Sequence, residues 1–338
     1  MAALDADCVL LRLKANRQKA MSSIDASTMA GGSGLYHWDT LIKGQPTRIE
    51  CMDILGQRYA VTRGAAAILS LEDEWYEDVR DPAAVVEELR NHKDFKPDLF
   101  TFWQRLPERE PRFQYHMEWE EIAVLPVKSY DHWFKQQIKS RVRNQIRKAE
   151  KEGVTVRETG FDDDFVRGMT AIFNEAPVRQ GRHFWHYGKS FETVKSQFSK
   201  YIHREHMIAA DYQGEMIGLI MLGNAGRFGL TGQIISAIKH RDKATNNLLI
   251  AKAVEVCARL GLPYLCYLFW SGDSLAEFKR RCGFEPVRVP RYYVPLTARG
   301  RLALKLGAHR GWKAMIPEGL KRKFKHWRSR WYAMKETE

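Results

Sequence analysis

The chain has 338 residues, of which 44% are hydrophobic and 28% are charged, a composition typical of a globular protein rather than a disordered or fibrous one. This length suits one large domain or two ordinary ones, and no apolar run is long enough to span a bilayer. The five cysteines form no CxxC pair, and residues 1–14 lack the layout of a secretory signal. We therefore expect a reduced, cytoplasmic protein.

The net charge of +13 is concentrated in two segments. Residues 135–151 carry seven Lys or Arg and one acid, and residues 299–330 carry eleven Lys or Arg and one acid. The remainder of the chain is slightly acidic. Basic charge that is confined to short segments predicts specific anionic partners rather than a generally basic surface.

The first part of the chain predicts a flexible leader over residues 1–34, which ends in a Gly/Ser stretch, and a strand-rich first lobe over residues 35–128. The predicted strands of this lobe are residues 48–54, 59–63, 66–72, 99–104 and 115–127. Asp81 and Pro82 predict the start of a helix that continues to residue 92, because an acid caps a helix and proline fits its first turn.

Residues 129–298 predict a second domain, which begins with one amphipathic helix over residues 130–153. The next predicted elements are a strand 154–158, a helix 162–174, a loop 175–190 and a helix 191–202. Three strands joined by tight turns come next, at residues 207–212, 216–224 and 229–238. The last predicted elements are a helix 244–260, a strand 264–269, a helix 274–282 and a strand pair within 286–295. This order predicts an α/β fold with a mixed (α+β) sheet.

Two stretches carry a resemblance to a known family: KSRVRNQIRKAEKEGVTVRE at residues 139–158 and LAEFKRRCGFE at residues 275–285. Together with the order of elements, they resemble the Fem-type (FemAB-like) branch of the GNAT superfamily over about residues 118–296. The resemblance implies a GNAT-like acyltransferase fold, in which residues 129–298 form the catalytic domain and the first lobe is a degenerate GNAT-like repeat. It also implies transfer of an acyl or aminoacyl group from CoA or tRNA to an amine, with an envelope precursor as the expected acceptor.

The sequence departs from the acetyl-CoA-dependent GNAT pattern at two places. The segment 239–247 contains no glycine where those enzymes usually carry a glycine-rich turn, and Lys279 stands where they often carry a tyrosine. Both departures favour the Fem-type reading.

The predicted donor site is the loop that precedes the helix 244–260, because the first N–H groups of a helix and nearby basic side chains bind phosphate. Its predicted residues are Lys239, Arg241, Lys243, Thr245, Asn246, Asn247 and Lys279. The alternative is that Thr245 or Asn246 simply caps the helix and that the basic side chains are solvated. We expect no tightly bound cofactor, with acyl-CoA or aminoacyl-tRNA as the co-substrate.

The predicted acceptor site is the loop 174–188, whose side chains suit a carboxylate or phosphate. Its predicted residues are Arg179, Gln180, Arg182, His186 and Tyr187. Glu175 is the predicted general base. A solvated loop and a solvated helix end are the respective alternatives. The resemblance implies that the backbone at Gly232–Ile234 stabilises the oxyanion. No metal site is predicted, because the His pairs lack zinc-type spacing.

Residues 299–338 predict a basic amphipathic tail, in which bases alternate with leucine and tryptophan. That pattern favours contact with an anionic membrane surface through residues 299–331, at the inner membrane face. Contact with RNA and packing against the domain remain the alternatives. The rival function is a non-catalytic RNA- or membrane-binding module on a GNAT scaffold.

Overall fold

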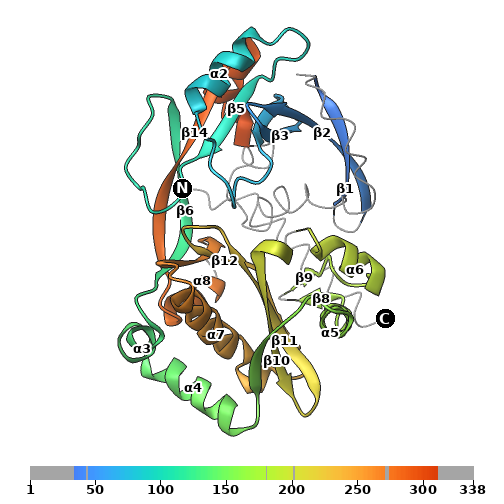
Figure 1. Cartoon of the computed structure of the whole chain (residues 1–338), viewed down its shortest axis with the longest axis vertical. Helices are drawn as coiled ribbons and strands as arrows, with labels where there is room; N and C mark the ends of the chain where they lie inside the picture. The colour runs from blue at the N-terminus through green and yellow to red at the C-terminus, as the bar shows by residue number, and fades with distance from the viewer. Residues whose placement is uncertain (1–33, 43–44, 180, 201, 271–273, 311–338) are drawn as a thin grey trace. The chain divides into compact units, whose positions relative to one another are not determined.

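The computed structural model describes residues 34–42, 45–179, 181–200, 202–270 and 274–310. The chain forms two compact units (Figure 1). Unit 1 contains the chain up to Trp119, residues 176–185 and the chain from Pro290 onward, and unit 2 contains Glu120–Glu175 and His186–Val289. The predicted leader up to residue 33 and the predicted tail beyond residue 310 lie outside the described residues.

Unit 1 is built on strands in the order β1-β2-β3-β4-β5-β14. Their bounds are β1 Tyr36–Ile42, β2 Gln45–Ile54, β3 Gln57–Thr62, β4 Ile68–Leu71, β5 Leu99–Trp103 and β14 Glu285–Pro295. The first four strands are antiparallel neighbours, β5 runs parallel to β4, and β14 runs antiparallel to β5. The predicted strand pair within 286–295 is wrong, because the backbone stays extended through Pro290 and β14 is one strand.

Helix α2 (Pro82–Asn91) connects β4 to β5 and covers the core of unit 1. It buries Val85, Val86 and Leu89 in a cluster with residues of the sheet. As predicted, Asp81 caps the helix: its carboxylate accepts hydrogen bonds from the N–H groups of Ala83 and Ala84, at 3.0 Å each. Asp81 and Pro82 therefore stabilise the start of this helix.

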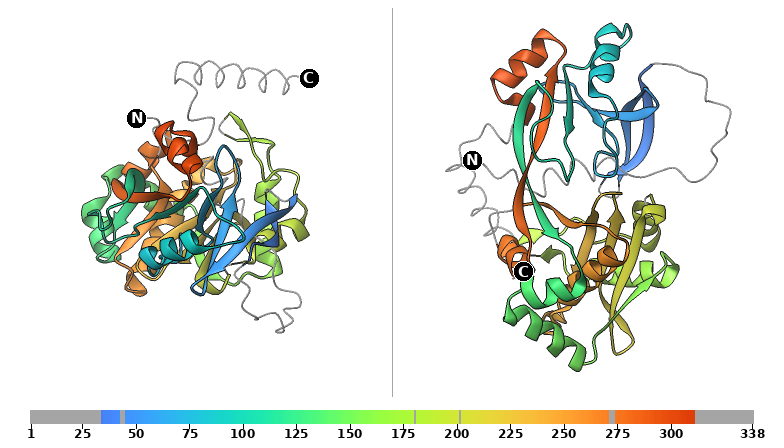
Figure 2. Two further views of the ribbon diagram at one scale, coloured as in Figure 1. Left: turned by 90° about the horizontal axis from the view of Figure 1, so that it is seen from above. Right: turned by 60° about the vertical axis from the view of Figure 1, so that its left-hand side comes forward.

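Helix α9 (Ala298–Lys305) follows directly from β14 (Figure 2) and packs on unit 1. Ala303 is buried in a cluster with Ala66 and Leu99. A Cβ atom at Gly300 would lie 1.9 Å from the carbonyl oxygen of Asp98, so the helix rests on that backbone. Residues 298–310 thus belong to the fold of unit 1.

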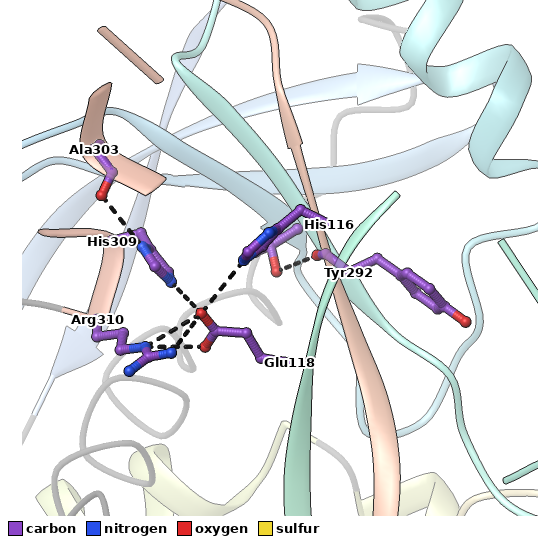
Figure 3. A network of polar contacts seen from close by, with 7 residues as sticks. His116, Glu118, Tyr292, Ala303, His309 and Arg310 are labelled. Atoms are coloured by element: carbon purple, nitrogen blue, oxygen red, sulfur yellow. Dashed lines mark hydrogen bonds and ion pairs between the residues drawn. The ribbon is translucent and has the colours of Figure 1, made fainter. Parts of the chain in front are cut away.

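Glu118, in β6 (His116–Pro126), holds the segment after α9 (Figure 3). Its carboxylate accepts hydrogen bonds from Nε2 of the buried His309 and from Arg310, both at 2.8 Å. Nδ1 of His309 lies 3.4 Å from the carbonyl oxygen of Ala303. Burial alone would raise the pKa of Glu118, but the hydrogen bonds from His309 and Arg310 lower it to about 2.

Unit 2 is built on strands in the order β6-β13-β12-β11-β10-β7. The bounds of those not yet given are β7 Thr155–Thr159, β10 Glu205–Tyr212, β11 Glu215–Asn224, β12 Gly229–Ser236 and β13 Tyr264–Phe269. Strands β7, β10, β11 and β12 are antiparallel neighbours in that order. Strand β13 runs parallel to β12, and β6 runs antiparallel to β13. All of these strands were expected from the sequence.

The long helices of unit 2 cover opposite faces of its sheet (Figure 1). On one face, α5 (Asp163–Phe173) approaches β11 so closely that a Cβ at Gly168 would meet the side chain of Met216. On the other face, α7 (Thr245–Arg259) lies over Gly218 and Gly229. Two shorter helices, α6 (Phe191–Phe198) and α8 (Ser274–Arg281), complete the predicted set. None of the helices described is long and apolar enough to cross a membrane.

The single helix predicted over residues 130–153 is wrong, because it is broken. It consists of α3 (Tyr130–His132), a π-helical turn (Trp133–Gln137) and α4 (Ser140–Lys151), with extended backbone at Ile138. The guanidinium of Arg143 donates hydrogen bonds to the carbonyl oxygens of Phe134 and Ile138, which the break leaves without helical partners. The break keeps the apolar side chains on one face, so the periodicity does not reveal it.

The two units repeat one topology. Each has four antiparallel strands, a crossover helix (α2 or α7), a fifth strand parallel to the fourth, and a sixth strand from a distant part of the chain. The sixth strand is β14 in unit 1 and β6 in unit 2. This is the GNAT-like order of elements, present in tandem, and it confirms the predicted mixed α/β fold.

Candidate donor site in unit 2

The neighbouring strands β12 and β13 form a backbone fork. They pair only at Gly229–Leu265 and Leu230–Cys266, although they contain eight and six residues. At the vertex, the hydroxyl of Thr231 donates a hydrogen bond to the carbonyl oxygen of Cys266, at 3.2 Å. Beyond this point the strands no longer pair with each other, so the fork opens toward their carboxyl ends.

A β-bulge in β12 accompanies the fork. The register against β11 shifts between Met221 and Leu222, and Gly232 is the extra residue. A bulge bends its strand, which here coincides with the point where β12 leaves β13. A Cβ at Gly232 would lie 3.4 Å from Oε1 of Glu205, so that carboxylate lies beside the bulge. The sequence did not single out Glu205, because only the strand register brings it next to Gly232.

Helix α7 begins at the open end of the fork, because β12 leads into it through residues 237–244. Its cap position is Ala244, which has left-handed backbone (φ 51°) and provides no capping side chain. Within the described chain, the buried atoms Thr245 Oγ1 and Asn246 Oδ1 make no hydrogen bond. The expected alternative, a cap by Thr245 or Asn246, is absent at the described start of α7.

The three basic side chains of the predicted donor loop, Lys239, Arg241 and Lys243, differ in their contacts. Lys239 pairs with Glu215 at 2.6 Å, and Lys243 pairs with Glu152 and Asp242 at 3.2 Å each. Hydrogen bonds to Glu152 and Asp242 raise the pKa of Lys243. Arg241 is exposed and has no ion pair among the described residues. It is therefore the cation of this loop that is available to an anion.

Asn247 and Lys279, also predicted for the donor site, lie inside unit 2. Asn247 is buried and donates a hydrogen bond to Oε1 of Gln145 at 2.9 Å, which joins α7 to α4. Lys279 is 1% exposed, and its ammonium donates to the carbonyl oxygens of Tyr267 and Phe269 at 2.9 and 2.7 Å. These carbonyls lie on β13, beyond the fork vertex, so Lys279 places a buried positive charge behind that strand.

Glu175 fixes the loop before α7. Its carboxylate accepts hydrogen bonds from the backbone N–H groups of Ile238 and Lys239, at 2.5 and 2.8 Å. The predicted base is thus bound to the backbone of the predicted donor loop. The sequence could not show this contact, because the two segments lie about sixty residues apart.

The predicted acceptor residues are divided between the two units. Arg179 and Arg182 face each other across the hairpin of β8 (Val178–Arg179) and β9 (Arg182–His183), in unit 1. In unit 2, His186 is buried with its ring stacked on Phe173, at 4.1 Å between centroids, and Tyr187 is exposed. Gln180 lies outside the described residues. Among the described residues, no cluster of His, Cys, Asp or Glu is arranged to hold a metal ion.

Comparison with known proteins gives distant structural likenesses. No protein-family model and no curated sequence matches the chain. The C-terminal domain of a putative lysylphosphatidylglycerol synthetase from Agrobacterium fabrum aligns with a TM-score of 0.48 at 12% identity, over 74% of this chain and 84% of that one. FemX aligns with a TM-score of 0.47 at 9% identity, over 90% and 99%.

A tandem GNAT protein from the clavulanic acid biosynthesis pathway aligns with a TM-score of 0.41 at 13% identity, over 88% of this chain and 97% of that one. The strand order, the bulge and the fork are observed directly in this chain and do not depend on these likenesses. By its own topology, the chain has a tandem GNAT-like fold.

Proposed function

We propose that unit 2 is an acyltransferase domain that moves an acyl or aminoacyl group from an activated, phosphate-bearing donor to an amine. The observation that carries the proposal is the open start of α7. A helix of fifteen residues begins without a capping side chain, beside buried polar atoms that lack hydrogen bonds, at the open end of a strand fork. Its free N–H groups and positive dipole end suit phosphate oxygens.

In the proposed reaction, the donor extends from the start of α7 into the fork between β12 and β13. The lone pair of the amine attacks the acyl carbon, a C–N bond forms, and the ester or thioester bond to the carrier breaks. The departing oxygen or sulfur takes up the proton that the amine loses. Backbone N–H groups near Gly232 are the proposed stabilisers of the oxyanion.

Direct attack, without a covalent enzyme intermediate, is consistent with the burial of Cys257 and Cys282. Burial raises the pKa values of the Cys257 and Cys282 thiols to about 12, so neither forms a thiolate nucleophile at neutral pH. We propose that Glu175 holds the donor loop in place and that Arg241 contacts the donor's phosphates. Within unit 2, His186 and Tyr187 remain proposed acceptor residues, with an envelope precursor as the proposed acceptor. Arg179 and Arg182 remain proposed acceptor residues of the β8–β9 hairpin in unit 1.

The rival function, a non-catalytic membrane-binding module, has one observation in its favour. Leu302 and Leu306 on and after α9 are 56% and 60% exposed, and Arg301 and Lys305 adjoin them. Such a face suits an anionic membrane surface. The same face is compatible with an enzyme that acts on a membrane-linked amine. We propose that this face brings the enzyme to the membrane surface.

The deciding experiment combines binding and turnover. The protein is incubated with a panel of acyl-CoAs and charged tRNAs, and the thermal unfolding midpoint is measured, since a bound donor stabilises the folded state by mass action. Transfer of a labelled acyl group to amines is then measured with each donor that binds. Stabilisation without any transfer would favour the binding module. The absence of both stabilisation and transfer would refute the donor site.

Arg241→Gln sharpens the test of this site. Loss of the charge should raise the KM for the donor about tenfold, equivalent to ~1.4 kcal/mol, and leave the KM for the amine unchanged. The matched control is Arg280→Gln, an exposed arginine on α8 that already pairs with Glu277. Equal donor KM values in the two variants would remove Arg241 from the site.

A further inference from the structure

The exposed face of α4 carries a stripe of cations. Arg141, Arg147, Lys148 and Lys151 are all exposed, while Val142, Ile146 and Ala149 bury the opposite side. At a rise of 1.5 Å per residue, the stripe from Arg141 to Lys151 is about 15 Å long. Over that length a nucleic-acid duplex presents several phosphates.

Most of these charges are not neutralised within the described protein. Arg141, Arg147 and Lys151 form no ion pair with a carboxylate in the part of the chain that the structure describes, whereas Lys148 lies 3.4 Å from Glu152. The exposed charged residues of α4 are these four cations and one acid, Glu150, whereas a solvated helix face usually carries the two signs in more equal numbers. The helix macrodipole accounts only for cations in the last turn of a helix. A predominantly basic stripe that starts at Arg141 instead complements an extended polyanion.

The stripe also lacks the apolar side chains that a membrane surface requires. Every exposed large hydrophobic residue of the described chain lies elsewhere, and α4 contributes none. An interfacial helix needs such residues beside its cations in order to enter the headgroup region. The face of α4 therefore suits phosphates that approach from water.

Helix α4 leads to the proposed donor site, since it lies against α7 within unit 2 (Figure 1). Gln145 of α4 binds Asn247 in the first turn of α7, and Glu152, just after α4, pairs with Lys243 in the loop before α7. An anion that follows the stripe thus arrives at the start of α7. A small carrier such as a coenzyme concentrates its phosphates at one end and would leave most of the stripe unoccupied.

We propose that the α4 stripe of Arg141, Arg147, Lys148 and Lys151 is an RNA-backbone surface, which holds the stem of an RNA whose acylated 3′ end enters the donor site. The choice of RNA rests on the proposed function, because RNA is the polynucleotide that carries activated acyl esters. The surface holds phosphates and reads no base sequence.

The test measures binding of a fluorescent RNA hairpin with a single-stranded CCA end to the full chain. The variant is Arg141→Gln/Arg147→Gln/Lys151→Gln, which removes three exposed charges without touching the core. At about 100 mM salt its Kd should rise at least about tenfold, and the slope of log K against log salt should fall by about 2 to 3. The control is Lys93→Gln/Lys96→Gln, two exposed lysines of unit 1 without an ion pair in the described residues.

The control should leave the Kd and the salt slope within about twofold of the parent, because it changes no charge of the α4 stripe. Any contribution of the basic chain end is the same in every protein compared. Absence of RNA binding by the parent, or equal losses in variant and control, would overturn the proposal. So would an RNA affinity that is unchanged in the variant while the binding of the same variant to vesicles of anionic lipid falls. Binding is measured without turnover, so failure of acyl transfer would be a separate result.

Discussion

Units 1 and 2 share a topology, but they differ where the crossover helix begins. In unit 1, β4 pairs with β5 at three positions, nearly the whole length of β4, and Asp81 caps α2 with two hydrogen bonds. In unit 2, β12 leaves β13 after two positions, and Ala244 offers α7 no cap. The same architecture is thus closed by side chains in one unit and left open in the other.

This difference concerns what occupies the first N–H groups of the crossover helix in each unit. A capping carboxylate occupies the N–H groups that an anion would otherwise use, and it contributes about 1 kcal/mol to stability. The open start of α7 instead leaves buried polar atoms unsatisfied, which costs stability in the free protein. Such a cost is expected at a site whose missing hydrogen bonds are supplied by a ligand.

The largest expected effect tests whether unit 1 needs α9 to be complete. Gly300→Ala places a Cβ atom against the backbone of Asp98, so the helix must move away from Leu99. We expect a loss of about 3 kcal/mol in the free energy of unfolding, measured by urea titration. Arg301→Ala, on the exposed side of α9, should stay within about 0.5 kcal/mol of the parent. A stable Gly300→Ala protein would mean that unit 1 is complete without this helix.

The second effect concerns the carboxylate that holds the segment after α9. The pKa of Glu118 is lowered from 4.5 to about 2, so its stabilisation is fully present above pH 4.5 and is lost as the pH falls toward 2. We expect the protein to lose on the order of 2 kcal/mol across this window. Glu118→Gln should already be destabilised at pH 7 and should lose less on acidification. Parallel pH curves for the two proteins would exclude this role.

The sequence predicted the secondary structure better than it predicted the site, although it missed strand β1. Alternation and helical periodicity predicted most elements, and the cap at Asp81 was correct because capping depends on local sequence. The broken helix at Ile138 escaped prediction, since the break preserves the apolar face. The contact of Glu175 with the loop before α7 joins segments about sixty residues apart, and the position of Glu205 beside Gly232 depends on strand register. No local pattern records register between distant segments.

A smaller effect separates stability from binding in the closed unit. Asp81→Ala removes the cap of α2 and should lower the free energy of unfolding by about 1 kcal/mol. The KM for the donor should not change, because the proposed donor site lies in unit 2. Asp131→Ala is the control, since its carboxylate pairs with exposed Lys135 and should contribute little. A raised donor KM in Asp81→Ala would show that the start of α2 also binds donor.

The smallest effect is an expected gain in stability, at the uncapped start of α7 in unit 2. The Thr245 hydroxyl is buried without a hydrogen bond among the described residues, so Thr245→Val should raise the free energy of unfolding by roughly 0.5 kcal/mol. If that hydroxyl serves the donor, the KM for the donor should rise severalfold in the same variant. The matched control is Thr231→Val, because the buried Thr231 hydroxyl donates to Cys266 and its loss should destabilise by about 1 kcal/mol. Equal destabilisation in both variants would show that Thr245 is satisfied in the free protein, and the contrast between the two helix starts would then disappear.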